Sequence, residues 1–268
     1  VYKRQILTFD NNGTYVEHHK NLSFEKNGIC GLEFKIESNC WGNFAENINT
    51  NEISINQNCS QKNILTLGGG KHAGSTITTI NSKNKIPVDL LIGDISFNNL
   101  IHLKNNGNKS ANSIIEVDNT FPSYDNPVNI HLFPYASSVD VNQDSKQDLL
   151  VSSNNELIGN NKEVHYYKNI GSDKDTFSFQ TKSFLVDNML DFGTGAYPIW
   201  VDENQDGLID ILVGNKSVNQ NGEMRASLNL LRNTGTPTNP SFELINEDYL
   251  KFSKNSESYL YPAIGDLD

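Results

Sequence analysis

The chain has 268 residues, a formal net charge of −11 at pH 7 and a hydrophobic content of 36%. This length suits one large all-β domain that buries a sizeable core. The acidic balance argues against nucleic acid as a partner, because the net charge would repel a polyanion. No stretch approaches the roughly 20 apolar residues of a membrane-spanning helix, so no membrane insertion is expected.

The first 65 residues do not share the pattern of the rest of the chain. Residues 5–9 and 14–17 flank a turn at 11–13, which is typical of a β-hairpin, and we expect residues 1–29 to complete a preceding repeat. Residues 30–65 contain all the cysteines, Cys30, Cys40 and Cys59, and are expected to form an insert. Cys40 and Cys59 are the preferred disulfide pair, with three reduced thiols as the alternative.

An internal repeat dominates the remaining chain. Similar segments begin at residues 134 and 196, and a third begins at 260. Their leading aspartates, Asp140, Asp202 and Asp266, recur at nearly constant spacing, and residues 164–171 match 228–235 further on. An earlier copy at 89–107 lacks the acidic loop, since Asn81, with lysines after it, occupies those positions. Repetition at a fixed period is the signature of a repeat architecture.

Each repeat contains several short apolar runs bounded by Asn, Gly and Asp, and none has helical periodicity. In the repeat at 191–255 we expect strands at 199–201, 210–214, 227–232 and 242–244. One such sheet cannot bury both of its faces, whereas sheets stacked around an axis can. The sequence therefore predicts an all-β propeller of four-stranded blades. The expected divisions are a degenerate blade at 66–127, blades with acidic loops at 128–190 and 191–255, and the start of another at 256–268.

The acidic loops follow the pattern Asp-x-Asn-x-Asp-x-x-x-Asp. Side-chain oxygens at alternate positions of a tight loop are the ligands that Ca²⁺ prefers, with a backbone carbonyl at position seven. The expected ligands are Asp140, Asn142, Asp144, the carbonyl of Lys146 and Asp148 in one loop, and Asp202, Asn204, Asp206, the carbonyl of Leu208 and Asp210 in the other. Asp266 and Asp268 begin a third set.

Two other kinds of loop share part of this pattern. An EF-hand needs a bidentate Glu at position twelve and a following helix, but Val151 and Val213 occupy that position and an apolar strand follows each loop. Polar turns that bind no ion are the remaining alternative. Gly207 at position six is expected to adopt a positive φ, and Ser145 replaces it in the first loop.

The repeats resemble FG-GAP or VCBS repeats of the integrin-type β-propeller family over residues 66 to 268. This resemblance implies seven blades in all, each with a calcium loop between its first two strands. The segments 91–100 and 40–44 also resemble large secreted proteins that gliding Bacteroidetes export by the type IX pathway. Because the third loop breaks off at Asp268, we expect the chain to be part of a longer polypeptide.

The function expected from these features is that of a secreted or cell-surface binding, adhesion or scaffolding module. Its partner would be a protein or a surface glycan, and the narrower resemblance adds the type IX secretion machinery. A polysaccharide lyase or glycoside hydrolase on the same fold is the alternative, although no catalytic residue stands out. We expect Trp200 to be buried in an inner strand and Trp41 to lie on the surface.

Overall fold

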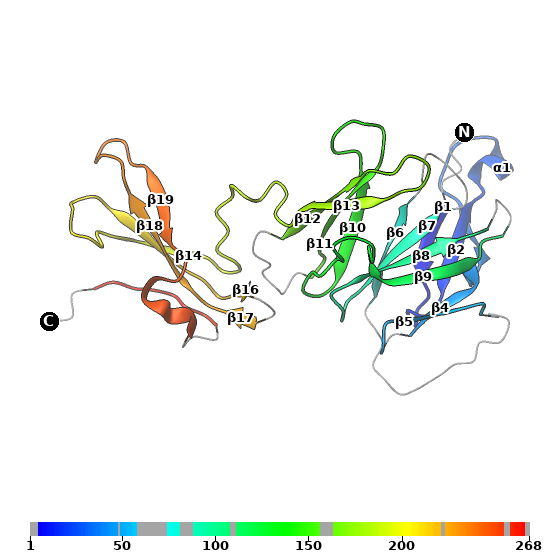
Figure 1. The fold of residues 1–268 in the computed structure, drawn as a ribbon, viewed down its shortest axis with the longest axis horizontal. Helices are drawn as coiled ribbons and strands as arrows, with labels where there is room; N and C mark the ends of the chain where they lie inside the picture. Colours follow the sequence, from blue (N-terminus) through cyan, green and yellow to red (C-terminus); the bar gives the residue numbers. More distant parts are fainter. Residues whose placement is uncertain are drawn as a thin grey trace. The chain divides into compact units, whose positions relative to one another are not determined.

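The structure is a computed structural model. It describes residues 5–47, 49–57, 74–80, 88–107, 111–155, 163–220, 223–254 and 258–265. The chain forms two compact units, one of Val1–Asn154 with Val164–Phe184 and one of Asn155–Glu163 with Leu185–Asp268. Within them the described chain is all-β, with several four-stranded antiparallel sheets (Figure 1). No helix in these described ranges is long and apolar enough to cross a membrane.

The first unit contains two four-stranded sheets, in each of which the strands pair in sequence order. The first sheet consists of β6 (Ser75–Ile80), β7 (Asp89–Asp94), β8 (Leu100–Asn105) and β9 (Ile114–Phe121). The second consists of β10 (Pro134–Val139), β11 (Asp148–Ser153), β12 (Val164–Asn169) and β13 (Phe177–Thr181). Each is an antiparallel meander, as expected for one repeat.

The second unit contains the third four-stranded sheet. Its strands are β14 (Tyr197–Val201), β15 (Asp210–Gly214), β18 (Leu228–Asn233) and β19 (Phe242–Asn246). A small hairpin of β16 (Val218–Gln220) and β17 (Glu223–Arg225) lies between β15 and β18 in sequence, and the 3₁₀ segment η3 (Tyr249–Lys254) follows β19. The sequence-derived four strands of this repeat are confirmed. The three sheets are consistent with propeller blades, and no closure into a ring is detected among the described residues.

The N-terminal part of the first unit adds two smaller sheets. One comprises β1 (Gln5–Phe9), β2 (Val16–Asn21) and β3 (Phe34–Ser38), with α1 (Ser23–Asn27) between β2 and β3. The other pairs β4 (Phe44–Asn47), which follows the 3₁₀ turn η1 (Trp41–Asn43), with β5 (Glu52–Ile55). The expected hairpin of β1 and β2 is confirmed. Cys40 is disulfide-bonded, Cys30 is free and exposed, and Cys59 lies outside the described residues.

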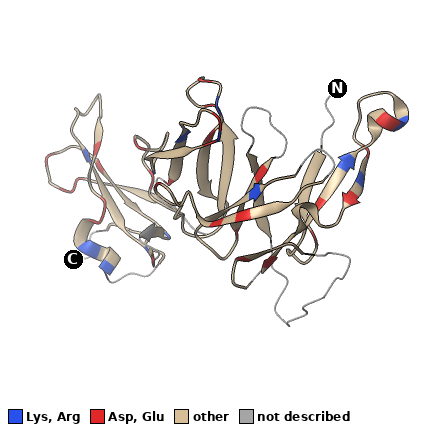
Figure 2. Ribbon diagram, turned by 45° about the vertical axis from the view of Figure 1, so that its right-hand side comes forward, with Lys and Arg blue, Asp and Glu red and all other residues tan. Residues whose placement is uncertain are grey.

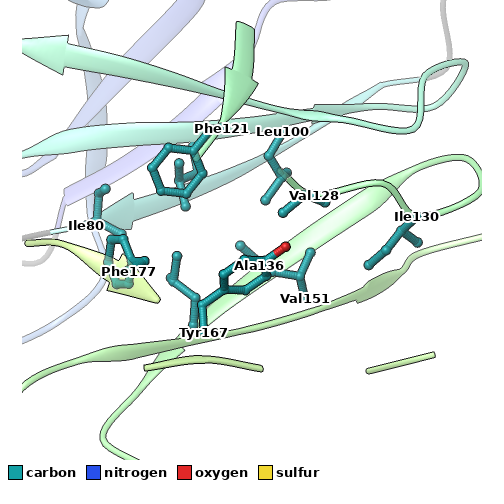
Figure 3. Packing of buried hydrophobic residues seen from close by; sticks show 11 residues of the cluster. Ile80, Leu100, Phe121, Val128, Ile130, Ala136, Val151, Tyr167 and Phe177 are labelled. Atoms are coloured by element: carbon teal, nitrogen blue, oxygen red, sulfur yellow. The ribbon is translucent and has the colours of Figure 1, made fainter. Parts of the chain in front are cut away.

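Strand β7 contributes side chains to two separate cores, because alternate residues of a strand point to opposite faces. Leu91 packs with residues of the second sheet, including Ala136, Val151 and Tyr167, in the cluster that Figure 3 shows. Leu90 packs instead with N-terminal residues in a second cluster. Burial on both faces explains why β7 is apolar throughout rather than alternating.

The prediction that Trp41 lies on the surface is wrong. Its side chain is only 5% exposed and belongs to the second cluster, together with Val16 and Phe44. The segment predicted to be an insert thus supplies core residues to the first unit.

The first strands of successive sheets lie against each other in the first unit. The Thr76 hydroxyl donates a hydrogen bond to the carbonyl of Pro134 (2.9 Å), and the Thr78 hydroxyl donates one to the carbonyl of Ala136. Gly93 allows this approach, because a Cβ at that position would lie 1.9 Å from the Pro134 carbonyl oxygen. Contact between the first strands of neighbouring sheets is the arrangement that a propeller requires.

The core of the second unit contradicts the expected burial of Trp200. Leu212 and Leu230 form this core, and Ile199 packs against it. Ile199 pairs with Leu212, whereas Trp200 pairs with Ile211, so the alternation of β14 turns Trp200 to the opposite face. Its side chain is 68% exposed and contacts the ring of Phe242, with a centroid separation of 6.3 Å.

Candidate functional site

The acidic loop at 140–148 joins β10 to β11 and folds around its own side-chain oxygens. The Asp140 carboxylate accepts hydrogen bonds from the backbone N–H groups of Asp144 (3.1 Å) and Ser145 (2.9 Å). The amide oxygen of Asn142 accepts a second bond from the N–H of Asp144 (3.1 Å). The Asp144 carboxylate in turn accepts one from the N–H of Lys146 (2.9 Å). Positions one, three and five of the motif therefore organise this turn.

The loop at 202–210 repeats the same hydrogen bonds between β14 and β15. The Asp202 carboxylate accepts from the N–H groups of Asp206 (3.1 Å) and Gly207 (3.0 Å). Asn204 accepts from the N–H of Asp206 (3.2 Å), and Asp206 accepts from the N–H of Leu208 (2.8 Å). Two loops separated in sequence thus adopt one conformation, as their shared motif predicts.

The backbone angles of the two loops agree as well. Gln143 and Gln205 at position four both have φ of 61°. At position six, Gly207 has the expected positive φ of 83°, and Ser145 has φ of 67°. A serine in the left-handed region is strained relative to glycine, so the backbone conformation at position six is less stable in the first loop than in the second.

The carboxylates at position five favour the ionised state. Hydrogen bonds from Asn204 and from the N–H of Leu208 lower the pKa of Asp206. For Asp144, desolvation acts in the opposite direction, but hydrogen bonds from Asn142 and Lys146 hold the pKa below its ordinary value. Both carboxylates are therefore anionic at neutral pH and suit a cation. Figure 2 shows acidic and basic residues interspersed along the strands and loops.

Metal ligation by these loops stays a prediction. Within the described ranges, no group of three or more His, Cys, Asp or Glu side chains is arranged to hold a metal ion. The proposed donor set also includes amide and carbonyl oxygens, which Ca²⁺ uses readily. The remaining candidates, Asp266 and Asp268, lie outside the described residues.

The aspartate at position nine has a structural role that the motif does not reveal. Each of these aspartates begins the second strand of its sheet, and its Oδ1 atom accepts a hydrogen bond from the backbone N–H of an asparagine that ends the third strand. The pairs are Asp89 with Asn105 (2.8 Å), Asp148 with Asn169 (2.7 Å) and Asp210 with Asn233 (2.8 Å). Asp148 and Asp210 are fully buried. We call each pair an Asp–Asn clasp.

The asparagine of each clasp completes a second set of repeated bonds. Its Nδ2 group donates to the carbonyl preceding the aspartate, at Val88 (3.0 Å), Gln147 (3.0 Å) and Ile209 (3.3 Å). Its Oδ1 atom accepts from the N–H of the glycine two residues later, at Gly107 (2.9 Å), Gly171 (3.1 Å) and Gly235 (3.1 Å). Each clasp therefore links the start of the second strand to the turn after the third.

The clasp also occurs in the sheet whose preceding loop lacks the acidic residues. Asp89 keeps the bond to Asn105 there, so the clasp does not depend on a metal loop. The sequence carries a signal for it, because an Asn-x-Gly triplet ends the third strand of every repeat. Buried polar groups need such partners, which explains why an aspartate is tolerated at a fully buried position.

A separate buried carboxyl lies in the first unit. Glu46 on β4 is 2% exposed, and the Ser75 hydroxyl contacts both of its carboxyl oxygens (3.2 and 3.0 Å). Burial raises the pKa of Glu46 to about 8, and the buried Asp94 at the end of β7 adds to this rise. Glu46 is therefore largely protonated at neutral pH.

No protein-family model matches the chain, and no curated protein is significantly similar to it. The resemblance to FG-GAP or VCBS repeats consequently rests on the repeat pattern and the sheets alone.

Proposed function

We propose that the chain is part of a secreted or cell-surface β-propeller whose acidic loops bind Ca²⁺ and which acts as a binding, adhesion or scaffolding module. The observation that carries this proposal is the duplicated loop. The turns at Asp140 and Asp202 share side-chain hydrogen bonds, positive φ positions and placement between the first two strands of a sheet.

Calcium fits the donor chemistry of both loops. Asp140, Asn142, Asp144 and the carbonyl of Lys146, with Asp148, would hold the ion in one loop. Asp202, Asn204, Asp206, the carbonyl of Leu208 and Asp210 would hold it in the other. All of these donors are oxygens, which a hard cation prefers. A carboxylate has about four lone-pair sites, so hydrogen bonds from N–H groups leave room for a cation. A bound ion would offset repulsion between the aspartates and brace the start of each second strand.

The propeller proposal is supported by the stacking of successive sheets in the first unit. Their first strands are joined by the threonine hydroxyls of β6, and an apolar core fills the space between the sheets. Further blades of the same kind would extend the arrangement around an axis, with seven expected by resemblance.

Location outside the cytoplasm is supported by the disulfide-bonded Cys40, because such bonds persist in oxidising compartments. Export by the type IX pathway is the route that the narrower resemblance suggests. The partner of such a module would be a protein or a surface glycan.

Thermal unfolding of the full chain in Ca²⁺, in Mg²⁺ and in chelator tests the metal proposal. We expect the chelator to lower Tm, Ca²⁺ to restore it, and Mg²⁺ to restore it poorly because Mg²⁺ demands a stricter octahedral geometry. Equal melting curves in all three conditions would remove calcium from the proposal.

A further inference from the structure

Three exposed tyrosines form a chain of ring contacts in the second unit, with Tyr261 between the other two. Tyr197, Tyr259 and Tyr261 are 50%, 59% and 51% exposed. The ring of Tyr261 lies 5.6 Å from that of Tyr197 and 6.3 Å from that of Tyr259, centroid to centroid. The ammonium group of Lys216 lies 5.3 Å from the centroid of the Tyr259 ring. We call these four residues the tyrosine platform.

Backbone hydrogen bonds hold the segments of the platform together. The N–H of Tyr259 donates to the carbonyl of Lys216 (2.7 Å). The N–H of Lys216 donates to the carbonyl of Thr194 (2.8 Å), and the N–H of Thr194 donates to the carbonyl of Ser217 (2.9 Å). Tyr197 follows on β14. The rings are therefore carried on a paired backbone, which reduces the entropy lost when a ligand binds.

Two residues of this region adopt left-handed backbone conformations. Gly195 has φ of 64°, and a Cβ there would lie 3.0 Å from Cβ of Lys216 and 3.4 Å from the hydroxyl of Tyr261. Tyr259 has φ of 65°, which is unfavourable for a bulky side chain. Such strain persists only where surrounding contacts maintain it, and it is concentrated at ligand-binding positions.

We propose that the tyrosine platform binds a neutral polysaccharide chain. Tyrosine presents an apolar face that suits the C–H face of a sugar ring, and its hydroxyl reaches the ring's polar edge. Lys216 contributes further donors for sugar hydroxyls. An uncharged glycan suits this chain better than a polyanion, because the formal net charge is −11. This inference deepens the proposed binding role and rests on it.

The platform also differs from an ordinary packed aromatic core. Each of its tyrosine residues is at least half exposed, whereas Tyr167 of the second sheet is fully buried in an apolar cluster. Exposed aromatic rings held on a paired backbone provide contact area at small entropic cost, which suits recognition.

Affinity electrophoresis tests the proposal with the full chain in native gels containing laminarin, galactomannan, xyloglucan or alginate. We expect at least one of the three neutral polysaccharides to retard the wild type. Tyr259→Ala and Tyr261→Ala are expected to weaken this retardation about tenfold, the equivalent of one lost ring contact. Tyr124→Ala, which removes a 55% exposed tyrosine of the first unit that has no equivalent in the platform, is the matched control and should bind normally.

Three results would overturn the glycan proposal: no retardation by any neutral polysaccharide, retardation by alginate alone, or equal retardation of the wild type and the platform variants. Melting curves of each variant in Ca²⁺ and in chelator accompany the gels. A null result in the gels with calcium-dependent melting intact would remove the glycan and leave the calcium proposal standing.

Discussion

Replacement of Asp210 and of Asp206 should separate the structural role of position nine from the metal-binding role of position five. Asp210 is fully buried, and its carboxylate accepts hydrogen bonds from the backbone N–H groups of Asn233 (2.8 Å) and Glu203 (3.2 Å). It also lies 3.6 Å from Nε of Arg232. Asp206 is exposed in the same loop.

The magnitude follows from the groups that lose their acceptor. Loss of the acceptor costs about 1–3 kcal/mol for the buried N–H of Asn233 and less for the part-buried N–H of Glu203, so Asp210→Ala should lower the free energy of unfolding of the second unit by about 2–4 kcal/mol in chelator. Asp206→Ala removes bonds at the surface and should change it by about 0.5 kcal/mol or less under the same condition. In Ca²⁺, however, Asp206→Ala should lose the stabilisation that the ion gives to the wild-type loop.

Urea unfolding followed by tryptophan fluorescence measures these changes. Trp200 lies on the strand paired with that of Asp210, and Trp41→Phe leaves it as the single reporter. If Asp210→Ala proves as stable as Asp206→Ala in chelator, the clasp does not stabilise the second unit.

Three further predictions concern the first unit. The pKa of Glu46 is about 8 in the folded chain, against an ordinary value of 4.5. The folded state therefore holds a proton that the unfolded state releases, and the free energy of unfolding should fall by up to about 1.4 kcal/mol per pH unit as the pH rises between these values. Glu46→Gln should abolish this slope in melting curves recorded across that pH range. A wild-type slope retained by that variant would assign the effect to another group. Gly93→Ala should lower the unfolding free energy by about 1–3 kcal/mol, since its Cβ would collide with the Pro134 carbonyl. Gly265→Ala, which meets no atom within 4 Å, is its control, and equal stability of the two would refute the steric argument. Ser145→Gly should raise stability by up to about 1 kcal/mol by relieving the positive φ, and a loss of stability would refute this.

The sequence was sufficient to predict the sheets of the repeats. Short apolar runs bounded by Asn and Gly predicted the strands that become β14, β15, β18 and β19, and boundaries differ by only a residue or two. The repeated Asp-x-Asn-x-Asp pattern likewise predicted two turns of the same kind, because local spacing determines which N–H groups the side chains can reach.

Properties that depend on partners distant in sequence were not predicted. Ile199, Trp200 and Val201 are all large and apolar, so their pattern did not show which face of β14 meets the core. The bond from Asn233 to Asp210 spans strands that are not adjacent in sequence, and the loop motif alone suggested only a metal ligand. The pairing of β3 with β2 was not predicted either, because that segment lies outside the repeats and has no second copy for comparison.

Calorimetric titration of Ca²⁺ into the chelator-treated chain measures directly whether the two acidic loops bind the ion. We expect saturable binding by the loops at Asp140 and Asp202, with Asp144→Asn and Asp206→Asn each removing one class of site. Heat changes no larger than dilution, or a titration unaltered by both substitutions, would contradict it.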